Sequence, residues 1–113
     1  MVNELKKPLQ CLLLSESLID SAMNGEKTIT IREGYRDYKP GRVILACPDI
    51  YWSKQVEVES VRHTTLDQVT EQEYIDDGFV SRTDLFEGLK SFYPELDLTS
   101  NVTVIRFKQS WED

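Results

Sequence analysis

Histidine and cysteine are scarce in this chain, which has one histidine and two cysteines among its 113 residues. His63, Cys11 and Cys47 stand far apart in the sequence, so the spacing of zinc ligands is missing, and we expect no metal and no cofactor. Both cysteines lie in apolar runs and are expected to be buried free thiols. The spacing also gives no support to a catalytic pair of Cys47 and His63.

Long hydrophobic runs are absent as well. No stretch approaches the ~20 apolar residues that span a bilayer, and the start of the sequence lacks the pattern of a secretory signal. We therefore expect a cytoplasmic protein with no membrane partner. Because repeats, low-complexity tracts and linkers are also missing, the length predicts one domain over residues 1–113, with its core at about residues 9–108.

Basic residues are too few to balance the acids. The chain has 13 Lys and Arg against 20 Asp and Glu, a net charge of −7. Binding to long nucleic acids depends on many contacts between basic side chains and phosphates, so RNA is a possible but disfavoured partner. A neutral nucleoside or another small molecule suits this charge better. We expect a monomer or a weak dimer.

The most informative segment is the sequence GEKTITIR at residues 25–32. It begins with a Gly-containing turn and continues as a strictly alternating strand, in which successive side chains point to opposite faces. Ile29 and Ile31 therefore enter a core. The other face carries the hydroxyls of Thr28 and Thr30 and the guanidinium of Arg32. The ammonium of Lys27 lies at the start of the strand. Such a set of groups is suited to binding and polarising a small polar substrate.

The rest of the chain predicts a mixture of short strands and helices. Strands are expected at residues 9–14, 28–32, 42–47, 55–61 and 101–108, and helices at 16–23, 66–77 and 82–92. In the strand at 55–61, we expect Val56, Val58 and Ser60 to share one face. Because regular crossovers do not separate the strands, the pattern favours an α+β fold, a small and mainly antiparallel β-barrel with flanking helices.

Three segments resemble the ASCH family: GEKTITIR, then KPG at residues 39–41, and the closing VTVIRF at 102–107. That family has a pseudouridine-synthase-and-archaeosine-transglycosylase-like (PUA-like) barrel. The narrower form KTITIR resembles small bacterial N4-acetylcytidine amidohydrolases, over about residues 12–108. The resemblance implies an enzyme that hydrolyses N4-acetylcytidine to cytidine and acetate.

The resemblance also implies a catalytic lysine, threonine and glutamate. The lysine and the threonine fall on Lys27 and Thr30. Counting forward from residues 69–71 places the acid at Asp77, whereas counting back from residues 92–94 places it one residue later. No glutamate occupies either position. Asp77 is our choice for the acid.

Two other acids remain open as alternatives, Asp76 beside Asp77 and Glu73 about one helical turn earlier.

The residues permit amide hydrolysis if Lys27 is neutral. The ordinary pKa of a lysine is about 10.4, and burial together with the charge of Arg32 would lower it toward ~7–8. Lys27 would then activate the Thr30 hydroxyl for attack on the acetyl carbon. The oxyanion would be stabilised by Arg32, Thr28 or a backbone N–H, while Asp77 holds Lys27 or handles the proton that goes to N4. Direct attack by water uses the same residues.

Aromatic side chains are candidates for binding the base, because stacking contributes roughly 1–3 kcal/mol per base. Tyr35 and Tyr38 lie in the loop after the motif, and Trp52 lies near the tip of a hairpin; of these we name Tyr35 and Trp52 as substrate-binding residues.

Simpler interpretations and other functions remain open. Threonines favour strands in any case, and Arg32 is able to form a surface ion pair with Glu33 or Asp37. The alternative function is a PUA-like module that binds RNA or a modified nucleotide without turnover, or a ribonuclease.

Overall fold

The structure is a computed structural model of the chain and describes residues 10–14 and 28–109. This part of the chain forms five strands and two α-helices, together with two short 3-10 helices. The strands are β1 (Gln10–Leu13), β2 (Ile29–Glu33), β3 (Gly41–Cys47), β4 (Trp52–Thr65) and β5 (Asn101–Gln109).

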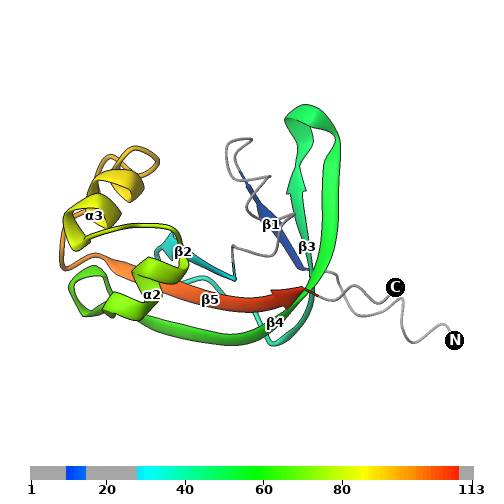
Figure 1. The fold of residues 1–113 in the computed structure, drawn as a ribbon, viewed down its shortest axis with the longest axis horizontal. Helices are drawn as coiled ribbons and strands as arrows, with labels where there is room; N and C mark the ends of the chain where they lie inside the picture. The colour runs from blue at the N-terminus through cyan, green and yellow to red at the C-terminus, as the bar shows by residue number, and fades with distance from the viewer. Residues whose placement is uncertain (1–9, 15–27, 110–113) are drawn as a thin grey trace, which may run out of the picture.

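The five strands form one curled sheet in the order β1-β3-β4-β5-β2. Only β1 and β3 pair in parallel, and the other three pairs are antiparallel. Figure 1 shows β4 running first beside β3 and then bending to run beside β5, so that the sheet closes partly on itself. The predicted α+β class and the mainly antiparallel barrel are confirmed, and β1 and β2 are the two edge strands.

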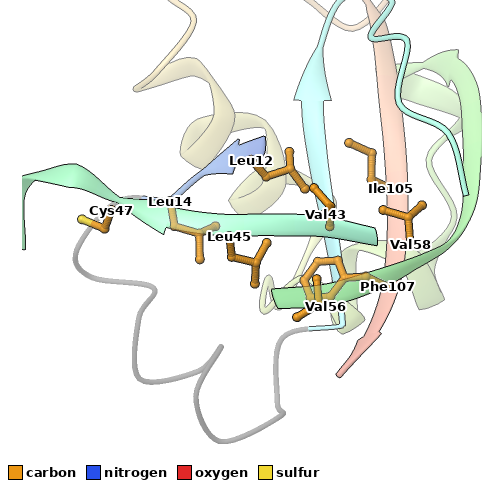
Figure 2. Packing of buried hydrophobic residues seen from close by; sticks show 9 residues of the cluster. All are labelled: Leu12, Leu14, Val43, Leu45, Cys47, Val56, Val58, Ile105 and Phe107. Atoms are coloured by element: carbon orange, nitrogen blue, oxygen red, sulfur yellow. The ribbon is translucent and has the colours of Figure 1, made fainter. Parts of the chain in front are cut away.

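The sheet separates two hydrophobic cores, one on each face. Directly opposite residues of antiparallel strands share a face, and β2 pairs Thr30 with Ile105 and Ile31 with Val104. We call the face that carries Thr30 and Ile105 the inner face, and the face that carries Ile31 and Val104 the helix face. The inner core shown in Figure 2 contains Leu12, Leu14, Val43, Leu45, Cys47, Val56, Val58, Ile105 and Phe107.

The core on the helix face lies between the sheet and the helices. It contains residues from β2, β5 and the helical segments: Ile29, Ile31, Leu66, Val69, Leu85, Leu89, Leu96, Val102 and Val104. The prediction that both isoleucines of the motif are buried is confirmed. Figure 1 shows both helices near the end of the sheet where β2 and β5 pair.

The long strand β4 contains a bulge that the sequence pattern did not predict. Pairing with β5 runs to Val58 and resumes at Ser60, so Glu59 is an extra residue. The extra residue shifts the alternation, and Val61 rather than Ser60 returns to the inner face, where it packs against the core. Our prediction that Ser60 shares a face with the preceding valines is therefore wrong.

The strand is also longer than predicted at both ends. A 3-10 helix, η3 (Pro48–Ile50), and Tyr51 in a left-handed conformation with φ 54° make the turn before it. As a result, Trp52 is already the first residue of β4 and lies opposite Cys47. At the other end, pairing with β5 continues to Thr65 instead of ending at residue 61.

The predicted helix at 66–77 is interrupted. A 3-10 helix, η4 (Leu66–Gln68), comes first, and the α-helix α2 (Glu71–Asp76) follows after two extended residues. Thr70 caps α2 through a reciprocal pair of bonds: its hydroxyl accepts from the Glu73 amide at 3.1 Å, and its own amide donates to Glu73 Oε1 at 2.9 Å. This capping box fixes where the helix begins, because it satisfies backbone donors that a continuous helix would bond internally.

The second α-helix, α3 (Arg82–Lys90), begins where predicted, because the Ser81 hydroxyl accepts a hydrogen bond from the Asp84 amide at 3.0 Å.

Several sequence predictions concern smaller features. Cys47 is buried as expected, but Cys11 is exposed, because on β1 its neighbour Leu12 takes the inner face. No helix in the described part of the chain is long and apolar enough to cross a membrane. The helix predicted at 16–23 and the residue Lys27 lie outside the described residues.

Candidate functional site

Thr30 places a polar side chain on the inner face of the barrel. The residue is only 5% exposed, and its Oγ1 accepts a hydrogen bond of 3.1 Å from Nε of Arg32. The two residues are separated by one position on β2, so strand alternation brings them to the same face. Because the guanidinium occupies a lone pair of Oγ1, the hydroxyl proton of Thr30 stays available for donation.

The same arginine connects the two edge strands of the sheet. Its Nη2 donates to the carbonyl oxygen of Leu13 on β1 at 2.8 Å, while Nε holds Thr30 on β2. The alternative of a surface ion pair with Asp37 is not what forms, since that carboxylate binds Lys39 at 2.6 Å. Arg32 therefore binds Thr30 and also holds the two edge strands of the barrel together. No local sequence pattern indicates its contact with Leu13.

The predicted alternatives to Asp77 are both held on the helix face. Asp76 accepts a hydrogen bond of 2.9 Å from Arg106, which lies opposite Ile29 on that face. Glu73 accepts from both Nε and Nη2 of Arg62, at 2.9 and 2.7 Å. Since Thr30 points to the inner face, the sheet separates it from these two carboxylates.

Both ion pairs alter the acidity of their carboxyl groups. The bond from Arg106, followed by one from Gln72, lowers the pKa of Asp76 below its ordinary value. Partial burial acts to raise the pKa of Glu73, but hydrogen bonds from Arg62 and from Thr70 outweigh it and lower that pKa. Each carboxylate is therefore kept ionised and anchored, which suits a structural role.

The structure gives less detail on the other residues predicted for catalysis. Asp77 is half-buried at the C-terminal end of α2, and its amide donates to the Glu73 carbonyl at 3.1 Å. Thr28 is half-buried just before β2, and its carbonyl oxygen accepts from the Phe107 amide at 2.9 Å. Roles for Lys27, Thr28 and Asp77 in catalysis remain predictions.

The two aromatic residues predicted to bind substrate lie at opposite ends of β4. Trp52 is half-buried at the start of this strand and packs against the inner core. Tyr35 instead stacks on His63, near the other end of the strand, with ring centroids 3.9 Å apart and planes inclined by 10°. The structure therefore does not bring Trp52 and Tyr35 together, and His63 likewise lies far along the strand from Cys47.

A pocket of about 340 Å³ opens beside the stacked rings. It is lined by Tyr35, His63, Thr64, Thr65, Asn101 and Val102. Apart from Tyr35, none of these residues was predicted to bind substrate, because the pocket forms only when the loop after β2 folds back onto the paired ends of β4 and β5. Within the described residues, no group of histidine, cysteine and acidic side chains is placed to hold a metal ion.

Comparison with known proteins identifies the fold. No protein-family model matches the sequence, and no curated protein matches it significantly. Among solved structures, an ASCH domain from Lactobacillus crispatus JV V101 superposes with a TM-score of 0.75 at 16% sequence identity, covering 96% of this chain and 83% of that one.

Two further structures support the same fold. A hypothetical protein named PH0355 gives a TM-score of 0.65 at 22% identity, covering 91% of this chain and all of its own. Protein EF3133 from Enterococcus faecalis V583 gives 0.66 at 10% identity, covering 96% of this chain and 82% of that one. The chain has the fold of an ASCH domain, a PUA-like barrel with flanking helices.

Proposed function

We propose that the protein is an amidohydrolase that converts N4-acetylcytidine to cytidine and acetate. One observation carries the proposal: the buried hydroxyl of Thr30 faces the barrel interior and accepts a hydrogen bond from Arg32. Its support comes from the ASCH-type fold and from the resemblance of the KTITIR segment to that class of amidohydrolases. A buried threonine with its proton free is suited to nucleophilic attack once a base is near.

The proposed reaction begins with Lys27 in its neutral form. Lys27 accepts the proton of Thr30 as Oγ1 forms a bond to the acetyl carbon, and the carbonyl oxygen becomes an oxyanion. Arg32, Thr28 or a backbone N–H stabilises this charge. The C–N4 bond then breaks, N4 receives the proton, and cytidine leaves. Water hydrolyses the acetyl ester on Thr30 to release acetate, with Asp77 positioning Lys27 or carrying the proton.

Arg32 has two tasks in this proposal. Donation from a permanently charged guanidinium draws electron density from Oγ1, so the threonine loses its proton more readily during attack. The same charge favours the neutral form of a nearby lysine.

A second function, binding of a modified nucleotide without turnover, is favoured by the pocket beside Tyr35 and His63. Its aromatic wall is suited to a nucleobase even if no reaction follows.

The test is incubation of the purified protein with N4-acetylcytidine, with cytidine and acetate separated by chromatography. We expect turnover by the wild type and a loss of at least about a hundredfold in Lys27→Met, because a general base contributes 10²–10⁴-fold. Lys108→Met, at an exposed position on β5, is the matched control and keeps full activity. Full activity of Lys27→Met would contradict the mechanism. Saturable nucleoside binding by a wild type that shows no turnover would favour the binding module.

A further inference from the structure

The loop that carries Tyr35 is tied firmly to the sheet. The Thr103 hydroxyl is fully buried, donates to the Gly34 carbonyl at 2.7 Å and accepts from the Arg36 amide at 2.8 Å. The Gly34 amide adds a bond of 2.7 Å to the carbonyl oxygen of Asn101. Because bonds on both sides of Tyr35 fix its backbone, its ring is held against His63 before any ligand binds.

Further along, the same loop is attached to β1. The Tyr38 hydroxyl donates to the Cys11 carbonyl at 2.6 Å, and Gln10 bonds the backbone of Lys39 through both ends of its amide, at 2.6 and 2.8 Å. A preformed aromatic wall binds a flat ring with little loss of conformational entropy.

The stacked rings leave one aromatic face and one ring nitrogen available. His63 Nε2 lies 2.9 Å from the Arg36 carbonyl oxygen, which is only an acceptor, so Nε2 carries the proton. In the neutral imidazole Nδ1 is then an acceptor. Tyr35 is 71% exposed although one side of its ring contacts His63, so its other side is open to a second ring.

The polar groups around the pocket match the edge of a neutral heterocycle. Across the described part of the chain, the side-chain amide of Asn101 has no hydrogen-bond partner, and it offers donors and an acceptor together. Thr65 donates to Asp67 at 2.6 Å, which places a carboxylate beside the lining. That negative charge disfavours an anion such as free phosphate, whereas an uncharged base with mixed donors and acceptors is accommodated.

We propose that this pocket, which we call the Tyr35–His63 pocket, binds the base of a neutral nucleoside. The base stacks on the open face of Tyr35 and its polar edge meets Asn101 and Nδ1 of His63. The volume of about 340 Å³ falls within the range of small-molecule sites. The class of ligand follows from the pocket alone, and only the choice of a pyrimidine rests on the proposed function.

His63, one of the residues that line the pocket, lies on the same face of the sheet as the proposed nucleophile. His63 on β4 and Arg32 on β2 both pair with Thr103 of β5, two residues along β5 from Ile105, which pairs with Thr30. This offset corresponds to about 7 Å along the strands. Binding in the pocket is therefore measurable separately from chemistry at Thr30.

The chain's single histidine makes a direct test possible, because its imidazole gives one unambiguous signal in a nuclear magnetic resonance spectrum. Cytidine, the product of the proposed reaction, is titrated into the labelled protein. We expect a saturable shift of the His63 signal, and we expect ribose alone to cause none. Tyr35→Leu should weaken binding by about tenfold or more, because it removes a stacking surface.

Two more variants test the geometry. Asn101→Ala should weaken binding severalfold by removing the hydrogen-bonding amide. Tyr51→Leu is the matched control, because this tyrosine is 98% exposed at the β3–β4 turn and lies outside the pocket. If Tyr35→Leu fails to fold, Asn101→Ala at its exposed position carries the test.

The outcomes separate this proposal from the proposed function. A shift of the His63 signal that persists in Thr30→Val, or that occurs in a protein without turnover, supports the pocket independently of catalysis. No saturable shift with cytidine, or equal binding by Tyr35→Leu and wild type, would overturn it even if the enzyme is active.

Discussion

Arg32 contacts two strands that are far apart in the sequence. Its guanidinium holds the Thr30 hydroxyl on β2 at 3.1 Å and the Leu13 carbonyl on β1 at 2.8 Å. Lysine carries the same charge but has no planar fork with which to make both bonds at once. The residue is therefore important for stability whether or not it also stabilises an oxyanion.

Arg32→Lys is expected to lower the free energy of unfolding by about 1–2 kcal/mol, because it removes hydrogen bonds made by a charged group. Chemical denaturation followed by circular dichroism measures this change. Arg42→Lys, at an exposed position on β3, is the control and should unfold like the wild type. Equal stabilities for the two variants would show that Arg32 does not connect the edge strands in solution.

The three neighbouring acids are expected to differ in function. Asp77→Asn should reduce hydrolysis of N4-acetylcytidine by at least about tenfold, if this residue positions the base or carries a proton. Asp76→Asn and Glu73→Gln should keep most of the activity, because each of these carboxylates is held in a structural ion pair, with Arg106 and with Arg62. Steady-state kinetics of the three variants make the comparison. The opposite ranking would move the catalytic acid away from Asp77.

At the scale of elements, α2 is a short helix that depends on its contacts with the sheet. It has six residues, fewer than isolated helices need for stability, so capping and ion pairs must contribute. Glu73 closes the capping box with Thr70 and also receives both bonds from Arg62. Asp76, near the other end of the helix, binds Arg106 of β5.

These contacts predict how stability depends on pH. The folded protein lowers the pKa of both Glu73 and Asp76, so their contribution is present above the pKa of the unfolded chain and is lost as the pH falls through the lower folded value. Thermal unfolding should therefore show a marked loss of stability below about pH 4.

Glu73→Gln should lower stability at neutral pH by about 1–2 kcal/mol and should weaken the dependence on pH in the acidic range. The exposed variant Glu57→Gln on β4 is the matched control. An unchanged acid profile in Glu73→Gln would show that this carboxylate does not anchor the helix.

How much of each element was predictable depends on how local its causes are. The β2 strand and the start of α3 follow from alternation and from a serine cap, and both were predicted. The bulge at Glu59 and the break before Thr70 were not, because each depends on pairing or capping that a periodic pattern does not record.

The candidate site likewise contains one feature that the sequence predicts and another that it does not. Thr30 and Arg32 share a face because of the period of the strand, so their proximity follows from the sequence. The stacking of Tyr35 on His63 joins residues 28 positions apart and depends on the loop bonds to Thr103, for which no local signal exists. Trp52 looked suited to stacking at a turn, but the turn closes earlier and its ring packs against the core.

For the whole molecule, the size of the pocket and the net charge suit a small ligand. The described residues form an ASCH-type sheet that closes partly on itself, and the aromatic pocket beside it is the size of a small-molecule site. A net charge of −7 opposes long polyanions, since their affinity depends on basic side chains. A nucleoside, which has a base for stacking and no phosphate, fits both properties.

The central claim is that the hydroxyl of Thr30 takes part in amide hydrolysis, and the most direct measurement is kcat/KM for N4-acetylcytidine in Thr30→Ser and Thr30→Val. Serine keeps the hydroxyl, whereas valine keeps the shape and removes it. The proposal predicts that the serine variant retains measurable activity and that the valine variant loses at least about a thousandfold. Thr83→Val, at an exposed position on α3, should match the wild type. A valine variant as active as the serine variant would contradict the account.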